Sequence, residues 1–251
     1  MKTRFHVLLA AMFAALALIA GPRLTQAQGP EKFTNLRVFP KNIAREELLA
    51  TMRGFSGALG VRCDFCHAEG DTTKSRGLDF ASDARAEKRT ARVMMKMVKD
   101  INGKLIPKAG IQSPASVGCV TCHHGLSRPE TLADALERAV EKDGVPAAQA
   151  RYRELRGKYY GSGAYDFRPG SLNSVAEWLA DARKDPDGAI AVANMSLEFD
   201  PNDAGTYAAL GRAQALKGDK AAAVASYQHA LTLDPENRRV KELLEAVQSG
   251  K

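Results

Sequence analysis

The sequence predicts a mainly α-helical protein in two parts, residues 31–128 and residues 129–251. Apolar residues recur at helical spacing in both parts, a 34-residue repeat occupies the second, and no alternating pattern is long enough for a useful strand. The first part contains all four cysteines, in two copies of one motif, among glycine-rich and irregular stretches.

The two motifs are Cys63-Asp64-Phe65-Cys66-His67 and Cys119-Val120-Thr121-Cys122-His123. Cys-x-x-Cys-His is the pattern for covalent attachment of c-type haem: each thiol forms a thioether, and the imidazole binds the iron as proximal ligand. The sequence therefore predicts two covalently bound c-type haems. Cys63, Cys66, Cys119 and Cys122 would attach them, and His67 and His123 would be the proximal ligands.

Two other uses of the cysteines are possible. Four thiolates can hold a structural zinc ion, and paired cysteines can form disulfides. Neither use explains why a histidine follows both cysteine pairs in a chain that has only five histidines. Haem attachment is the interpretation that accounts for both residue types.

Residues 1–27 have the pattern of a secretory signal peptide. A basic start at Lys2 and Arg4 precedes the apolar run 7–20, and small residues surround a cleavage site after Ala27. An uncleaved anchor is the alternative, but a run of about 14 residues is shorter than the roughly 20 of a spanning helix. We expect a periplasmic or otherwise exported protein with no membrane-spanning segment after signal removal.

The charge of the chain does not indicate a nucleic-acid partner. The formal net charge is +7, and three of the positive charges (Lys2, Arg4 and Arg23) lie in the leader with no acid beside them, which leaves +4. No block of Lys and Arg is interleaved with aromatic residues. We therefore expect no nucleic acid among the partners.

Each motif is preceded by a predicted amphipathic helix. The first helix spans 43–59, is capped by Asn42 and is stopped by Gly60. The second spans 84–102, is capped by Ser82 or Asp83, and ends at Gly103. The C-terminal end of the first helix leads directly into the first motif.

Both helices carry methionine on their apolar faces: Met52 on the first, Met94 and Met97 on the second. Methionine at helical spacing often only fills a core. Ligation of either iron by two histidines is not expected, because His124 adjoins a proximal ligand and His229 lies in the other part of the chain. Methionine, lysine or an open position therefore remains for the sixth ligand.

Several short segments lie within or beside these helices and motifs. They are Asn35-Leu36, Phe39-Pro40-Lys41, Arg45-Glu46-Glu47-Leu48, Thr51-Met52-Arg53, Gly60-Val61-Arg62 before the first motif, Asp79-Phe80-Ala81-Ser82-Asp83, Ala91-Arg92-Val93-Met94-Met95, Ile101-Asn102, and His124-Gly125 after the second motif. With these segments, residues 31–128 resemble the cytochrome c subunit family of photosynthetic reaction centres.

The resemblance implies the distal iron ligands. In that family each haem-binding unit is a helix, a turn and the Cys-x-x-Cys-His motif, and a methionine of the preceding helix is usually the sixth ligand. Carried over by position, this implies Met52 for the haem on Cys63 and Cys66. It implies Met94 for the haem on Cys119 and Cys122, with Met97 as the second choice. The chain departs from the family in having two motifs where the full subunit binds four haems. It also has His124 where the family usually has arginine.

The C-terminal part repeats with a 34-residue period, which aligns Asp200-Pro201 with Asp234-Pro235. The better copy, 202–235, has small and aromatic residues where tetratricopeptide repeats carry their packing residues: Tyr207, Leu210, Gly211, Ala223, Tyr227, Ala230 and Pro235. Further helices are predicted over 130–142, 146–159, around Trp178, and over 236–248 as a terminal cap. The fold prediction is therefore a dihaem cytochrome c domain of helix–turn–motif units followed by a tetratricopeptide-like α-solenoid, with Met195 in the solenoid core.

A solenoid can bind a partner or serve only as a folded extension; we expect partner binding. The aromatic segment 159–167 could be a docking patch, but burial at a hinge is the expectation.

Three functional classes fit these features: an electron carrier with two six-coordinate irons, a dihaem enzyme such as a peroxidase or reductase, and a haem-based sensor or scaffold. An enzyme would need an open iron with a polar residue above it, and the sequence has no obvious distal histidine. We expect an exported, non-catalytic electron carrier whose redox partner proteins dock on the repeats.

Overall fold

The computed structural model describes residues 33–71, 77–110 and 116–250. The predicted signal peptide lies outside the described residues. Among these residues the protein is mainly helical, and the only strands are two residues long: β1 (Ala68–Glu69) pairs antiparallel with β2 (Leu78–Asp79). The prediction of a mainly α fold is confirmed.

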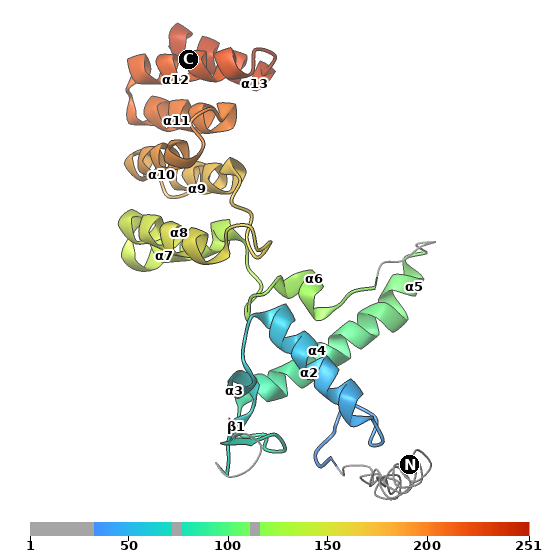
Figure 1. Ribbon diagram of the computed structural model, residues 1–251. Helices are drawn as coiled ribbons and strands as arrows, with labels where there is room; N and C mark the ends of the chain where they lie inside the picture. The colour runs from blue at the N-terminus through green and yellow to red at the C-terminus, as the bar shows by residue number, and fades with distance from the viewer. Residues whose placement is uncertain (1–32, 72–76, 111–115, 251) are drawn as a thin grey trace, which may run out of the picture.

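The described residues of the N-terminal part contain two long helices and four short helical segments. Their bounds are α2 Arg45–Leu59, α3 Cys63–Cys66, α4 Ala86–Asp100, a π-helical turn Ile101–Leu105, α5 Ile106–Lys108 and α6 Cys119–His123. Each cysteine motif thus forms a helical turn of its own, and α2 leads into the first of them (Figure 1).

The predicted helix ends are right in one case and wrong in another. Helix α2 ends where predicted, because Gly60 takes the left-handed conformation (φ 65°) that a helix C-terminus favours. Gly103 does not end the second helix: it lies inside the π-helical turn, and the left-handed glycine is Gly110 (φ 67°). A glycine ends a helix only where the backbone turns into that conformation, and the sequence does not reveal at which glycine this happens.

The predicted N-caps of these two helices are also wrong. Helix α2 begins after Ala44 and α4 after Arg85, and neither start has a side-chain cap. The carboxylate of Asp83 is instead engaged by Arg92 and Asn35, so it is not available to the first turn of α4.

The C-terminal part is a stack of antiparallel helix pairs closed by a single helix (Figure 1). The bounds are α7 Leu132–Asp143, α8 Val145–Tyr159, α9 Pro169–Asp181, α10 Pro186–Phe199, α11 Ala204–Lys217, α12 Lys220–Leu233 and α13 Arg238–Ser249. Every helix predicted here forms, and the tetratricopeptide-like solenoid is confirmed. Figure 1 places it to one side of the two long N-terminal helices.

Four of these helices begin with the same cap, in which an Asp or Asn side chain accepts a hydrogen bond from the amide three residues later. The caps are Asp185 to Gly188 (2.9 Å), Asp203 to Thr206 (2.6 Å), Asp219 to Ala222 (3.0 Å) and Asn237 to Val240 (3.2 Å). Each cap satisfies an amide that has no partner within the helix. Their recurrence reflects the 34-residue period, because Asp203 and Asn237 occupy the same repeat position.

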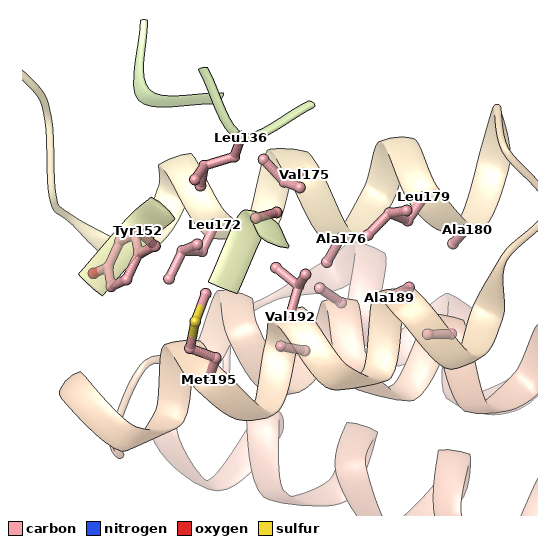
Figure 2. Close-up of a cluster of buried hydrophobic side chains, with 14 of the residues drawn as sticks. Leu136, Tyr152, Leu172, Val175, Ala176, Leu179, Ala180, Ala189, Val192 and Met195 are labelled. Carbon is pink, nitrogen blue, oxygen red and sulfur yellow. The ribbon is translucent and has the colours of Figure 1, made fainter. Parts of the chain in front are cut away.

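The core of the protein lies almost entirely in the solenoid. Leu136, Tyr152, Leu172, Val175 and neighbouring side chains pack between the helices (Figure 2). Met195 is buried among them, as predicted. Gly211 is required for close packing, because a Cβ atom there would lie 2.8 Å from the Tyr227 ring.

None of the described helices is long and apolar enough to cross a membrane.

Candidate haem-attachment sites

The two cysteine pairs are presented by the helical turns α3 and α6. A spacing of three residues places both thiols of a pair on the same side of a turn. All four cysteines are free thiols: Cys63 and Cys122 are exposed, and Cys66 and Cys119 are half-buried. Burial raises the pKa of the Cys66 thiol, and Glu87 and Cys63 add to this. The four thiols are therefore accessible to a bound porphyrin.

The two cysteine pairs do not come together. Among the described residues, no three side chains of His, Cys, Asp or Glu are placed so that they could hold a metal ion. A structural zinc site would need four thiolates around one point. The described residues thus do not gather the two cysteine pairs around one point.

His123 is oriented by the backbone that follows its motif. Its Nδ1 lies 2.7 Å from the carbonyl oxygen of Leu126, which is a buried residue. A carbonyl can only accept, so Nδ1 carries the proton and Nε2 keeps a free lone pair. A hydrogen bond at one ring nitrogen is the usual way in which a protein fixes the tautomer of a metal-ligating histidine. The Nε2 atom of His123 is thus left with a lone pair that a metal ion could use.

His67 is held by packing. It directly follows α3, is half-buried, and its ring lies edge-on to Phe80 with the ring centroids 4.8 Å apart. Burial lowers the pKa of His67, the charge of Lys88 lowers it further, and Asp79 and the Phe80 carbonyl offset only part of this. The lowered pKa favours the neutral form of the ring, which is the form that a metal ligand requires. Its Nδ1 is buried without a hydrogen-bond partner among the described residues.

A polar turn holds Phe80 against His67. The Asp79 carboxylate accepts hydrogen bonds from the amides of Ala81 and Ser82, both at 2.9 Å. Lys88 adds two bonds, from Nζ to the carbonyls of Phe80 (2.8 Å) and Ser82 (2.6 Å). The turn is thereby tied to the first part of α4.

Asp83 is the centre of a second network, which joins the segment before α2 to α4. Its carboxylate accepts from Arg92 at 2.8 Å and from the Asn35 amide at 2.9 Å, and Lys88 Nζ lies 3.4 Å away. The hydrogen bonds from Arg92 and Asn35 hold the pKa of Asp83 well below its usual range. The segment before α2 is thus fixed to the helix that precedes the second motif.

Asn102 positions the second motif. Its side chain donates to the Val117 carbonyl at 2.7 Å and accepts from the Val117 amide at 2.8 Å. This pair of bonds mimics strand pairing and fixes the backbone two residues before Cys119. The segment Ile101-Asn102, which contributes to the family resemblance, therefore has a defined structural role.

The motifs also contact each other's helices. The amide of Gly125, just after the second motif, donates to the Ala58 carbonyl near the end of α2 (2.9 Å), and a Cβ atom at Gly60 would collide with the Gly125 carbonyl. The first motif packs instead on the beginning of α4. Each long helix therefore leads toward one motif and touches the other, so the two attachment turns are parts of one unit.

The methionines lie on helix faces that protein atoms leave largely uncovered. Met94 is 41% exposed and Met97 is 46% exposed, while Met52 on α2 is half-buried. Helix α4 is amphipathic yet has no buried residue. Among the described residues from 33 to 128, only Leu48, Ala58 and Leu126 are buried apolar residues. This part of the chain has apolar faces without a matching protein core.

Sequence reasoning missed the Asp83 network and the Asn102 bonds. Both join residues far apart in sequence, 48 positions in the case of Asn35 and Asp83. The one local signal is the backbone of Asn35, which has φ 65°, but a positive φ cannot be read from sequence.

Comparison with known proteins supports the resemblance stated above. Residues 30–129 match the family model for the photosynthetic reaction centre cytochrome C subunit. Cytochrome c-554 of Chloroflexus aurantiacus is 38% identical over 69 residues, which is 28% of this chain and 15% of the relative. The photosynthetic reaction center cytochrome c subunit of Rubrivivax gelatinosus is 29% identical over 94 residues, covering 34% of this chain and 24% of the relative. The resemblance is confirmed, and the chain spans less than a quarter of the length of these relatives.

Two solved structures are similar to the helical repeats. The first tetratricopeptide domain of the human RPAP3 protein covers 47% of this chain and 87% of its own, with a TM-score of 0.35 and 15% identity. The first such domain of Spaghetti (RPAP3), bound to an HSP90 peptide, covers 47% of this chain and 89% of its own, with a TM-score of 0.34 and 16% identity.

Proposed function

We propose that this protein is an exported dihaem c-type cytochrome that transfers electrons between redox partners. One observation carries the proposal: two Cys-x-x-Cys-His turns with accessible thiols lie in a part of the chain whose amphipathic helices have almost no protein core. A porphyrin attached to each turn would supply that core, because a large apolar cofactor covers the faces that side chains leave open. The similarity to named cytochromes supports the same class.

The residues of the chain have separate roles in this proposal. Cys63 and Cys66 attach one haem, and Cys119 and Cys122 attach the other. When bound, each haem supplies an iron that cycles between the ferrous and ferric states. His67 and His123 provide the proximal nitrogens, the first through its packing against Phe80 and the second through its bond to Leu126. The protein binds and orients the cofactors, and no proton transfer is required.

Met52 and Met94 are proposed as the distal ligands, with Met97 as the alternative to Met94. All three lie on α2 or α4, on faces that are at least partly open. A thioether ligand stabilises ferrous iron, so His/Met ligation favours relatively high potentials. Covalent attachment, with a histidine and a methionine to hold each iron, would suit one-electron exchange without binding of a substrate to the iron.

Export and partner binding complete the proposal. The basic and apolar leader over 1–27 directs secretion, and the mature protein resides in the periplasm or a comparable compartment. The solenoid has its own core and needs no cofactor, so its surface is free to bind redox partner proteins. The division at residue 128 separates a haem-binding domain from a docking domain.

Redox titration of the purified protein tests the function. The haem absorption should change reversibly by two electrons per chain, because both irons cycle. A variant with Cys119→Ser and Cys122→Ser should exchange one electron per chain. A protein that lacks haem absorption, or that exchanges electrons only irreversibly, would contradict the proposal.

A further inference from the structure

We propose that a groove on the solenoid, called here the arginine–aromatic groove, binds an acidic segment of a partner protein. In this segment an apolar side chain is flanked by carboxylates. The groove lies where α8 ends against the end of α10, in neighbouring layers of the stack (Figure 1). One half, of about 430 Å³, is lined by Arg153, Arg156, Gly157, Tyr160 and Phe199. The inference deepens the proposed function, since it gives the docking domain a site and a ligand chemistry.

The groove continues into a second half of about 470 Å³, which shares Arg156, Tyr160 and Phe199 with the first. This half is also lined by residues of the segment 161–169, Arg168 among them, and by Asp200. The aromatic segment that was expected to be buried at a hinge therefore forms one wall of the groove. Tyr160 is 66% exposed, which overturns that expectation for this residue, whereas Tyr165 and Phe167 are half-buried.

Arg156 is held at the centre of the groove by aromatic rings. Its guanidinium carbon lies 4.1 Å from the ring centre of Tyr160 and 4.6 Å from that of Phe199. One nitrogen donates to the hydroxyl oxygen of Tyr152 at 3.3 Å. A guanidinium has five N–H donors in a planar fork, so this arrangement leaves donors for an anion and fixes the direction in which they point.

The neighbouring arginines are paired with acids. Arg153 bonds Glu198 at 2.8 Å, and Arg168 bonds Asp166. Arg156, by contrast, has no carboxylate partner within the described ranges, although it is half-buried. A half-buried cation without a counter-charge favours binding of an anion more than an exposed or paired cation does. The carboxylate that completes this site must come from outside the described structure.

The walls of the groove select the rest of the ligand. Phe199 is 38% exposed and, with Tyr160, offers an apolar surface on both sides of Arg156. An aliphatic or aromatic side chain would cover this surface, and aromatic anchors contribute much of the affinity of protein interfaces. Asp200 lines only the second half of the groove, so the carboxylates of the ligand should gather at Arg156 on the side of the first half. An acidic segment with one apolar anchor matches these features.

Peptide binding to the full-length holoprotein tests the site. The probe is fluorescein-labelled Glu-Glu-Phe-Glu-Glu, with Gln-Gln-Phe-Gln-Gln and Lys-Lys-Phe-Lys-Lys as comparison peptides, and the measurement is fluorescence anisotropy at low and high salt. We expect the acidic peptide to bind at least about tenfold more tightly than the other two, with affinity falling as salt rises. Arg156→Gln should weaken that binding about tenfold or more, and Arg156→Lys should weaken it less.

The matched control is Arg183→Gln, because Arg183 also lies over an aromatic ring, that of Trp178 at 5.6 Å, but outside the groove. This variant should leave peptide binding unchanged. Equal binding of the acidic and amide peptides, absence of binding by all three, or equal affinity of wild type and Arg156→Gln would overturn the proposal. Haem absorption and reduction by dithionite, measured on the same samples, report on the proposed function separately, because a failure of the groove leaves both intact.

Discussion

Met52→Ala and Met94→Ala are each expected to open one iron of the holoprotein. Loss of the thioether removes the ligand that stabilises ferrous iron, so the potential of the affected haem should fall. A decrease on the order of 0.1 V is expected, a fraction of the roughly 0.8 V range that axial ligands control. Carbon monoxide should bind to the reduced variants at one iron per chain and should not bind to the wild type.

Met195→Ala is the matched control for this experiment. Met195 is buried in the solenoid core, so its truncation should destabilise the repeats by about 2–5 kcal/mol while leaving both haem spectra unchanged. If Met97→Ala changes the spectrum and Met94→Ala does not, the ligand lies one turn further along α4. If none of the three variants on α2 and α4 binds carbon monoxide, methionine ligation is wrong.

The assignment of each methionine to a particular haem needs a second design, because each long helix also touches the motif of the other unit. Each methionine variant is combined with Cys63→Ser and Cys66→Ser, or with Cys119→Ser and Cys122→Ser. In the chain that keeps only the haem on Cys63 and Cys66, Met52→Ala should allow carbon monoxide binding and Met94→Ala should not. The reverse result would exchange the two assignments.

A chain that ends at Arg128 should keep both haems and lose its partner. The helices of each part pack mainly among themselves, and the buried apolar residues of the solenoid form clusters that contain no residue before 128. We therefore expect the shortened chain to bind two haems and to undergo reversible reduction by dithionite. Electron transfer from the native donor should slow at least about tenfold at donor concentrations below saturation, because docking is lost.

Arg156→Gln in the full chain is the sharper version of the same experiment, because it leaves every helix in place. This variant should reproduce part of the decrease in the rate of electron transfer at low donor concentration. The rate at saturating donor concentration should not change. If the shortened chain fails to take up haem, the solenoid is needed to fold the N-terminal part. If it reacts with the native donor at the full rate, the repeats have no role in recognition.

The features that the sequence predicts well are local or periodic. Gly60 ends α2 because a single glycine can take the left-handed conformation at that position. The 34-residue period locates the solenoid helices, and Gly211 and Tyr227 pack against each other where the repeat pattern expects them. In these cases the residue type and its spacing contain the structural information, so no knowledge of distant contacts is needed.

The features that were missed depend on contacts between distant residues. Asp83 was expected to cap a helix, but Arg92 and Asn35 compete for its carboxylate. The arginine–aromatic groove forms only when Phe199, at the end of α10, comes next to Tyr160. The choice between Met94 and Met97 also remains a prediction, because both lie exposed on α4 and the fold alone does not select one.

The intact mass of the mature protein is the most direct test of the dihaem proposal. We expect a chain that begins near Gln28 and whose mass exceeds that of the polypeptide by two haem groups. This increment should survive denaturation, because four thioether bonds hold the haems. Replacing Cys63 and Cys66, or Cys119 and Cys122, by serine should remove one covalently attached haem. A mass equal to that of the polypeptide plus a zinc ion, with no haem increment, would show that the protein is not a dihaem cytochrome.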